Sequence, residues 1–245
     1  MKIPKSHPRH ESLERRERIA KGVEKGITSI HGLIAHGRGD AFDYLIGEKT
    51  NEIAKKSVNS AAALLLLAKH PVISVNGNAA ALVPKELATL SKLINAPLEV
   101  NIFHSSNKRE AKIKNHLKKF GAKNVLLPDK QFKIKYLESN RKYVNPKGIL
   151  HGDVIFVPLE DGDRTEALIK NGKKIIAVDL NPLSRTAQKA TITIVDNITR
   201  AIPLLIHQIM KFKRLKLSRR QLEVIYGHHD NKKRLAKIIK IIKKL

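Results

Sequence analysis

The 245-residue sequence lacks cysteine and tryptophan, and aromatic residues make up only 4% of it. Without cysteine, disulfides, thiolate metal sites and a thiol nucleophile are excluded. The few aromatic side chains give little support to a stacking surface for single-stranded nucleic acid. No segment approaches the roughly 18 charge-free apolar residues of a membrane span, and the first residues lack the apolar core of a signal peptide. We therefore expect a cytoplasmic protein with no membrane span.

Acidic residues are also few: 22 Asp and Glu stand against 48 Lys and Arg, which gives a formal net charge of +26. Such a surplus is typical of a basic solvated surface, or of a protein that binds nucleic acid or another anion. Much of it is local, because residues 211–245 contain thirteen Lys or Arg but only Glu223 and Asp230 as acids. Hydrophobic residues, at 42%, suffice for an ordered core.

Three short apolar, β-branched runs organise the second half of the chain, at residues 154–157, 174–178 and 191–195. Each is too short for a helix and is typical of a buried strand. Helical patterns follow the first and third runs. An earlier run, residues 71–75, ends in the polar turn Asn76-Gly77-Asn78 and also leads into a helix. This β-α-β order predicts an α/β protein with a mostly parallel sheet.

Each of the three runs ends in a polar cluster, at residues 160–165, 179–181 and 196–199. Because the carboxyl ends of parallel strands line one edge of a sheet, the clusters are expected to face one another there, where ligands bind. Carboxylates suit ribose hydroxyls or a metal, Arg185 suits phosphate, and helix-initiating amides suit anions. The sequence therefore predicts a nucleotide site, although it contains no GxGxxG dinucleotide motif at the first strand.

Other elements follow from periodicity and caps. Further helices are expected over residues 12–25, 50–69, 107–120 and 198–210, and further strands over residues 98–103 and 125–127. Thr50 is the expected cap of its helix. In the first helix, Arg16 shares a face with Leu13 and Ala20, either as a snorkelling arginine or as an anion ligand. Residues 128–152 are irregular and form either an excursion over the active-site edge or a surface loop.

The segment His36-Gly37-Arg38-Gly39 opens a short helical pattern. Glycines beside an arginine at a helix start would allow the backbone to approach a phosphate closely. A glycine-rich turn on its own is weak evidence, because most such turns have no ligand.

Several segments together resemble one enzyme family. They are residues 7–9 (HPR), 32–44 (GLIAHGRGDAFDY), 72–80 (VISVNGNAA), 157–167 (VPLEDGDRTEA), 177–188 (AVDLNPLSRTAQ) and 192–203 (ITIVDNITRAIP). In this order they resemble archaeal-type phosphopantothenate synthetase, also called 4-phosphopantoate–β-alanine ligase, from about residue 3 to about residue 210. Asp40 stands where relatives often have Glu, and residues 128–152 and the basic tail match poorly.

The resemblance implies a Rossmann-like fold with helices on both faces of the sheet, a homodimer, and an ATP-dependent amide ligase of coenzyme A biosynthesis. Such an enzyme would join 4-phosphopantoate to β-alanine and cleave ATP to AMP and pyrophosphate, with Mg²⁺ expected. The implied ATP contacts are Arg16, Arg38, Asp179, Leu180, Asn181, Arg185, Thr186, Asn197 and Ile198.

The implied chemistry activates a carboxylate as an acyl-adenylate, which the β-alanine amine then attacks. Arg16, Arg38 and Arg185 suit the phosphate charge, since guanidinium binds phosphate in a forked geometry. Asp161 and Asp163 would hold Mg²⁺, or attract and deprotonate the ammonium group. Helix capping by Asp163 is the structural alternative.

The phosphopantoate substrate would meet other groups. Asn76, Asn78 and the Gly77 amide are candidates for its polar groups or its phosphate. His36, with Gly37, is a candidate phosphate contact, although a lone histidine more often has a structural role.

The expected organisation is one nucleotide-binding domain, residues 1–210, whose first 70 residues are helical, followed by a basic helical extension at residues 211–245. At the end of the chain, Leu235, Ile238, Ile239, Ile242 and Leu245 form one helical stripe. The stripe favours a docked terminal helix over a membrane-surface helix or an RNA-binding arm. Two other functions stay open: a basic nucleic-acid-binding protein, and a kinase or nucleotidyl transferase on the same sheet.

Overall fold

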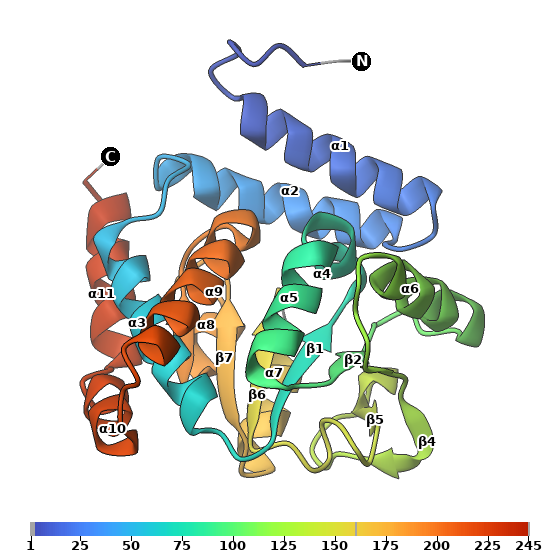
Figure 1. Cartoon of the computed structure of the whole chain (residues 1–245). Helices are drawn as coiled ribbons and strands as arrows, with labels where there is room; N and C mark the ends of the chain where they lie inside the picture. The colour runs from blue at the N-terminus through green and yellow to red at the C-terminus, as the bar shows by residue number, and fades with distance from the viewer. Residues whose placement is uncertain (1–2, 160, 245) are drawn as a thin grey trace.

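A six-stranded sheet lies at the centre of the computed structural model, which describes residues 3–159 and 161–244 (Figure 1). All its strand pairs are parallel, and the order is β3-β2-β1-β6-β7-β8. The strands are β1 (Pro71–Val75), β2 (Leu98–Val100), β3 (Val125–Leu126), β6 (Val154–Pro158), β7 (Lys174–Val178) and β8 (Ile192–Ile194). The order runs outward in both directions from β1 and β6, which is the Rossmann arrangement. The predicted α/β fold is therefore confirmed.

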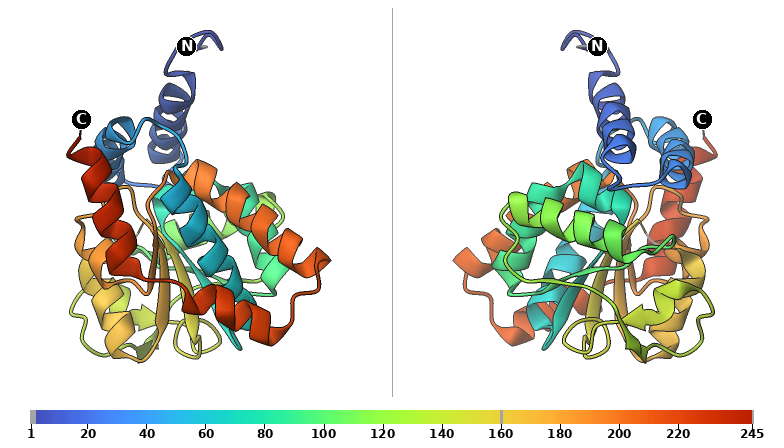
Figure 2. Two further views of the ribbon diagram at one scale, coloured as in Figure 1. Left: turned by 90° about the vertical axis from the view of Figure 1, so that its left-hand side faces the viewer. Right: turned by 90° about the vertical axis from the view of Figure 1, so that its right-hand side faces the viewer.

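The strands are mostly apolar because helices cover both faces of the sheet (Figure 2). Ile73, Phe156 and Ile176 point to the face covered by α3 (Glu52–Leu67), α5 (Pro84–Ile94), α6 (Asn107–Lys119) and α9 (Ile198–Arg214). Ile155 and Ile175, one residue earlier in register, point to the face covered by α7 (Gly162–Lys170). Asn51, rather than the predicted Thr50, caps α3 by accepting from the Ala54 amide, while Thr50 donates to Asp196.

Two N-terminal helices, α1 (His10–Glu24) and α2 (Ile30–Leu45), cross the top of the sheet in Figure 1. Ser29 caps α2, so the segment expected to open a helix at His36 lies in the middle of one. The buried face of α1 carries Arg15 and Ile19, so the predicted stripe through Arg16 was wrong by one residue. The physical reason is that Arg15 pairs with Asp43, a buried carboxylate on α2.

Residues 128–152 form more structure than predicted. They contain the two-stranded antiparallel sheet β4 (Asp129–Lys133) and β5 (Tyr143–Val144), joined through the short helix η1 (Asn140–Lys142). Strand β2 ends at Val100, earlier than predicted, and the Asn101 side chain donates to the backbone oxygens of Arg141 and Tyr143. The small sheet is thus fastened to the large one beside the carboxyl end of β2.

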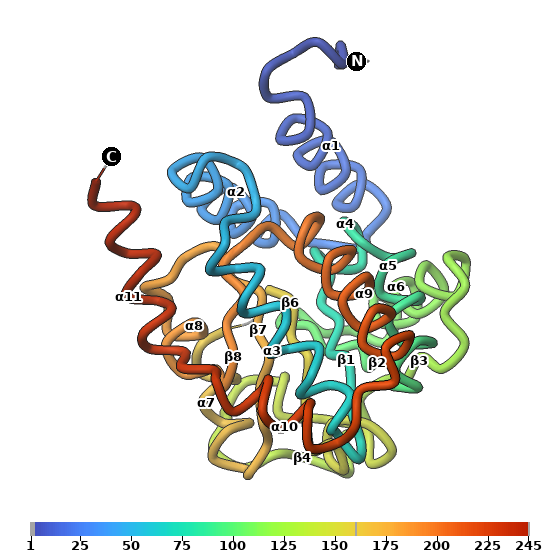
Figure 3. The backbone as a smooth tube through the Cα atoms, turned by 60° about the vertical axis from the view of Figure 1, so that its left-hand side comes forward, coloured from blue at the N-terminus to red at the C-terminus, as the bar shows by residue number. Residues whose placement is uncertain are grey.

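The C-terminal helices α10 (Arg219–Gly227) and α11 (Asn231–Ile242) return to the side of the sheet that carries α3 (Figure 3). Leu235 and Ile238 are only 2% exposed and pack in a cluster with Leu180 and Ala187, which confirms docking of the tail on its own chain. Leu245 lies outside the described residues. The proposed boundary at residue 210 stays a prediction, and α9 runs across it to Arg214. In the described part of the chain, no helix is long and apolar enough to cross a membrane.

Candidate functional site

A pocket of about 680 Å³ opens where the strand order changes direction, at the carboxyl ends of β1 and β6. Ligands of open α/β sheets bind at such a switch point. The loops after β1, β2, β6 and β7 supply its floor, and one face of α2 supplies its roof. Two of the three predicted polar clusters, at residues 160–165 and 179–181, therefore meet at this edge under α2, whereas none of residues 196–199 lines the pocket.

One end of the pocket lies over β7 and the start of α8 (Arg185–Lys189). Asp179 accepts hydrogen bonds from the Asn181 amide (2.9 Å) and from the Ser184 hydroxyl, so its carboxylate is held in one orientation. Burial raises the pKa of Asp179, although both hydrogen bonds oppose the rise. A fixed, half-buried carboxylate with further acceptor lone pairs suits the hydroxyls of a ribose.

Arg185 begins α8 and lies flat over Gly162, the first residue of α7. A Cβ at Gly162 would stand 2.4 Å from the Cβ of Arg185, so only glycine fits there. The Arg185 Nη2 donates to Glu166 Oε2 at 2.6 Å, and this contact lowers the pKa of Glu166. The guanidinium is 60% exposed at the rim, so it is accessible to an anion in the pocket.

Asn76 and Asn78 follow β1 and join neighbouring segments. Asn76 caps α4 (Gly77–Leu82) and donates to the Leu159 carbonyl. Asn78 donates to the Gly32 carbonyl at 2.8 Å and accepts from the Thr28 hydroxyl. Both side chains line the pocket, but these contacts occupy much of their hydrogen-bonding capacity. Their first role is to hold α2 and β6 beside β1.

The α2 residues divide between two sides of the helix. Arg38 is exposed and lines the main pocket, whereas Gly37 lines a second hollow of about 650 Å³ on the other side. His36 borders both, and its buried Nε2 has no hydrogen-bond partner among the described residues. Burial lowers the pKa of His36. Burial thus favours the neutral form of the imidazole over the charged form.

Arg16 lies in the second hollow, not in the main pocket. Its Nη2 donates to Asp40 Oδ2 at 2.8 Å. Burial raises the pKa of Asp40, but the hydrogen bond and charge of Arg16 outweigh burial, so that the net pKa is lowered. In this structure Arg16 is the partner of a carboxylate, and α2 separates it from the other residues predicted to contact ATP.

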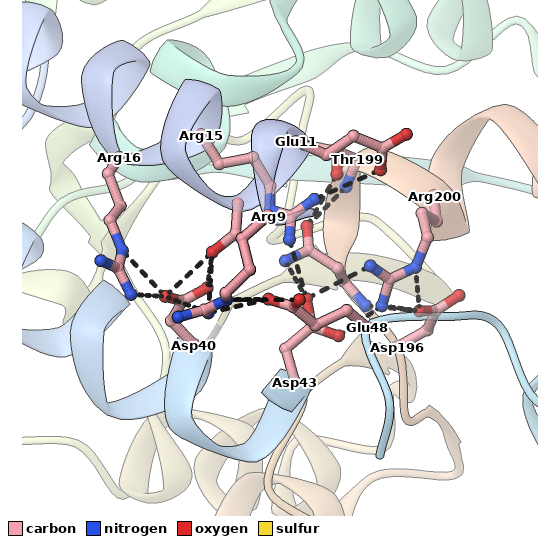
Figure 4. A network of polar contacts seen from close by, with 12 residues as sticks. Arg9, Glu11, Arg15, Arg16, Asp40, Asp43, Glu48, Asp196, Thr199 and Arg200 are labelled. Carbon is pink, nitrogen blue, oxygen red and sulfur yellow. Dashed lines mark hydrogen bonds and ion pairs between the residues drawn. The ribbon is translucent and has the colours of Figure 1, made fainter. Parts of the chain in front are cut away.

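Asn197 and Ile198 are buried and outside the pocket lining, and Asn197 donates to Asp43, which belongs to a buried ion network (Figure 4). Asp43 is fully buried and accepts from Arg15 (3.2 Å), Asn197 (3.0 Å) and Arg200. Arg15 comes from α1 and Asp43 from α2, while Asn197 caps α9 and Arg200 lies in its first turn, so the network fixes α1 and α2 to the start of α9. Removing one ion from such a network leaves its partners buried without counter-charge.

The loop after β6 carries two acids in different settings. Asp161 occupies the N-cap position of α7, lines the pocket and pairs with Arg141. Asp163, two residues later, is exposed and outside the lining, and it accepts from the Arg164 amide at 2.8 Å. The helix-capping position predicted as an alternative for Asp163 thus belongs to Asp161.

Several pocket residues had no signal in the sequence. Arg141 is 3% exposed and reaches the pocket from the irregular, basic segment, where no periodicity marks it. His31, His104 and Arg109 line the end of the pocket over β2. They come from a helix start and a loop that only the tertiary fold brings together, so spacing in the chain could not reveal them.

A sequence model described as phosphopantothenate/pantothenate synthetase matches residues 53–245. This chain belongs to that family. It is 52% identical over 240 residues to a 4-phosphopantoate–beta-alanine ligase of Thermococcus kodakarensis, covering 97% of this chain and 90% of that protein. It is 48% identical over 239 residues to a protein of the same name from Methanosarcina mazei, covering 97% of this chain and 92% of the relative.

The residues predicted to contact ATP divide into two groups by their position relative to the main pocket. Arg38, Asp179, Leu180, Asn181, Arg185 and Thr186 meet in the main pocket. Arg16, Asn197 and Ile198 lie outside its lining. The residues of the first group that follow β7, from Asp179 to Thr186, gather at one end of the pocket.

Proposed function

We propose that this chain is an ATP-dependent ligase that joins 4-phosphopantoate to β-alanine, giving 4′-phosphopantothenate, AMP and pyrophosphate in coenzyme A biosynthesis. The proposal rests on two relatives named 4-phosphopantoate–beta-alanine ligase, each of which shares about half of its residues with this chain. The structural observation that carries it is the pocket, which gathers six predicted ATP contacts at one sheet edge from segments far apart in the chain.

The reaction needs two displacements. A carboxylate oxygen of 4-phosphopantoate attacks the α-phosphorus of ATP, and pyrophosphate leaves. The β-alanine nitrogen then attacks the acyl carbon of the adenylate, AMP leaves, and the amine loses its proton. No protein nucleophile is involved, so the protein acts by positioning the reactants and screening their charge.

The pocket offers groups for both tasks. Arg38 and Arg185 line the pocket and would bind phosphate oxygens of ATP, and Asp179 would accept from the ribose. Asp161 is a half-exposed carboxylate at the junction with β1 and would attract the β-alanine ammonium. A role for Asp163 in amine deprotonation stays a prediction, and its exposed position would require the substrate to reach the first turn of α7.

Magnesium would be bound mainly by ATP itself. Among residues 3–159 and 161–244 no three His, Cys, Asp or Glu side chains gather as a metal cluster. Asp161 and Asp179 are the carboxylates in the described lining. Mg²⁺ commonly takes one or two carboxylates together with substrate phosphates and waters, so this donor set fits the ion. The ion would neutralise phosphate charge.

We further propose a homodimer, which the resemblance implies. The outward face of α2 exposes Ile30, Ile34 and Tyr44 by 61%, 62% and 62%. An exposed apolar stripe of this kind marks an interaction surface, and a second copy would cover it. Light scattering decides the point, because a mass near 27.5 kDa rather than its double would contradict the dimer. A cytoplasmic location and independence from nucleic acid also stay predictions.

The proposed function is tested by incubating purified protein with ATP, Mg²⁺, 4-phosphopantoate and β-alanine. We expect an amide product by mass spectrometry, with AMP and pyrophosphate formed in equal amounts. ADP with a newly phosphorylated product would instead support a kinase. Binding to arbitrary RNA that weakens steeply with salt, without turnover of ATP, would support the nucleic-acid alternative.

A further inference from the structure

The two ends of the pocket differ in charge. Among the described residues that line the pocket, the carboxylates are Asp161, which follows β6, and Asp179, which follows β7. The opposite end, over β1 and β2, is lined by Arg109, His31 and His104 together with the hydroxyl residues Thr28 and Ser29. The charged and titratable groups at this end are therefore bases, and hydroxyl groups lie beside them.

Arg109 has no counter-ion in the part of the chain that the structure describes. Its Nη1 donates to the His104 carbonyl (3.0 Å) and its Nη2 to the Ile27 carbonyl (3.4 Å). Its Nε is buried and has no hydrogen-bond partner among the described residues. Across residues 3–159 and 161–244 no carboxylate forms an ion pair with it. Burial lowers the pKa of Arg109, and no acidic neighbour counters this effect.

That isolation contrasts with three other arginines near the site, although the exposed Arg38 also forms no ion pair among the described residues. Arg16, Arg141 and Arg185 each pair with a carboxylate. A half-buried guanidinium that is bound only to carbonyl oxygens keeps its full positive charge toward the pocket. Burying such a charge without a partner costs free energy, which an anionic ligand would offset.

The groups around Arg109 leave room for a compact anion. The His31 and His104 rings lie side by side, with centroids 4.7 Å apart. A Cβ at Gly77 would stand 3.0 Å from Arg109 Nη2 and 2.6 Å from the Ile27 oxygen. A side chain at this position would therefore crowd the Arg109 guanidinium. The N-terminus of the 16-residue helix α2 begins at Ser29, and its dipole also favours negative charge.

The cationic end is remote from the nucleotide end. Strands β2 and β7 are separated by β1 and β6, so their carboxyl ends lie about 14 Å apart at the usual strand spacing. ATP contacts placed over β7 therefore leave the β2 end for a different negatively charged group. The phosphopantoate substrate carries such a group at the opposite end from its reacting carboxylate.

We propose that Arg109, with His31 and His104, binds the phosphomonoester of the acid substrate. The inference rests on the proposed function and adds the orientation of that substrate: phosphate over β2, carboxylate toward the nucleotide over β7. Asn76 and Asn78 then lie along the middle of the bound molecule, beside β1. Its one free hydroxyl group would meet them there.

The test combines a protein change with a ligand change. Calorimetry measures the binding of 4-phosphopantoate, unphosphorylated pantoate and ATP to the wild-type protein and to Arg109→Gln. A lost charge-assisted contact corresponds to roughly ten- to hundredfold weaker binding. We expect that loss for 4-phosphopantoate and unchanged affinities for pantoate and ATP. Lys108→Gln is the matched control, because Lys108 is exposed on the same helix and outside the lining.

Other outcomes overturn the inference. Weaker ATP binding with unchanged 4-phosphopantoate binding would assign the subsite to the ATP phosphates, and equal loss for pantoate and 4-phosphopantoate would make Arg109 structural. If Arg109→Gln does not fold, the double variant His31→Gln/His104→Gln decides: 4-phosphopantoate binding at least threefold weaker supports the subsite, and a smaller change contradicts it. These binding data stand apart from amide formation, so a wild-type protein that binds but makes no amide would refute the proposed function alone.

Discussion

The Arg141 guanidinium donates to the Asp161 carboxylate, and so joins the small sheet to the residue that precedes α7. The Arg141 Nε also donates to Asn101 Oδ1 at 2.9 Å, beside the end of β2. One buried side chain thus connects the loops after β2 and β6 on two sides of the pocket. The segment that carries it, residues 128–152, is therefore part of the site's framework.

The first prediction measures this pair with a double-mutant cycle on Arg141→Gln and Asp161→Asn. We expect a coupling of about 1–2 kcal/mol in the free energy of unfolding from urea titrations, because Arg141 is buried but Asp161 is half exposed to solvent. The exposed pair Arg219–Glu223 is the control, with an expected coupling below about 0.5 kcal/mol. Equal coupling in both pairs would show that the Arg141 contact has no special role.

The second prediction concerns ATP. Arg185→Ala and Arg38→Ala should each reduce kcat/KM for ATP roughly ten- to hundredfold while the melting temperature stays unchanged, since both side chains are exposed at the pocket. Lys189→Ala is the control for Arg185, because Lys189 ends the same short helix and lies near the same Glu166 without lining the pocket. Wild-type kinetics in both arginine variants would disprove this position for the phosphates.

What the sequence could predict was local. Strands β1, β6 and β7 are short, mostly apolar runs in the sequence, and a polar turn follows each. Their common edge could therefore be expected before the fold was known. The sequence could not show whether Arg15 or Arg16 is the buried arginine of α1, because that depends on Asp43 from a neighbouring helix. Arg109 and Arg141 also escaped notice, since a single arginine in a basic segment has no pattern until the fold supplies its neighbours.

The third prediction tests the docked tail with two isoleucines of α11. Ile238→Ala should destabilise the protein by about 2–4 kcal/mol, because Ile238 is 2% exposed and its removal leaves a cavity. Ile241→Ala should change stability by less than about 1 kcal/mol, since Ile241 is 41% exposed. Denaturant midpoints check both values. If both variants are equally stable while binding to anionic vesicles falls, the tail would act as a membrane-binding arm instead.

The fourth prediction is a pH dependence from Glu99. Burial raises the pKa of Glu99 to about 7, although amides of Ile149 and Asn145 donate to its carboxylate. A carboxyl group whose pKa is raised on folding stabilises most below its unfolded pKa, and this contribution is lost as the pH rises to the folded pKa. The stability of the wild type relative to Glu99→Gln should therefore fall between pH 4.5 and about 7. A relative stability that increases over that range would contradict the raised pKa.

The most direct test of the central claim, that the pocket forms an acyl-adenylate, follows an oxygen atom. The protein is incubated with ATP, β-alanine and 4-phosphopantoate labelled with ¹⁸O in its carboxylate, and the nucleotide product is analysed by mass spectrometry. The oxygen that attacks the α-phosphorus leaves with AMP, so we expect one ¹⁸O atom in each AMP formed. Label in inorganic phosphate, with ADP as the nucleotide product, would show activation at the γ-phosphate and would contradict the account.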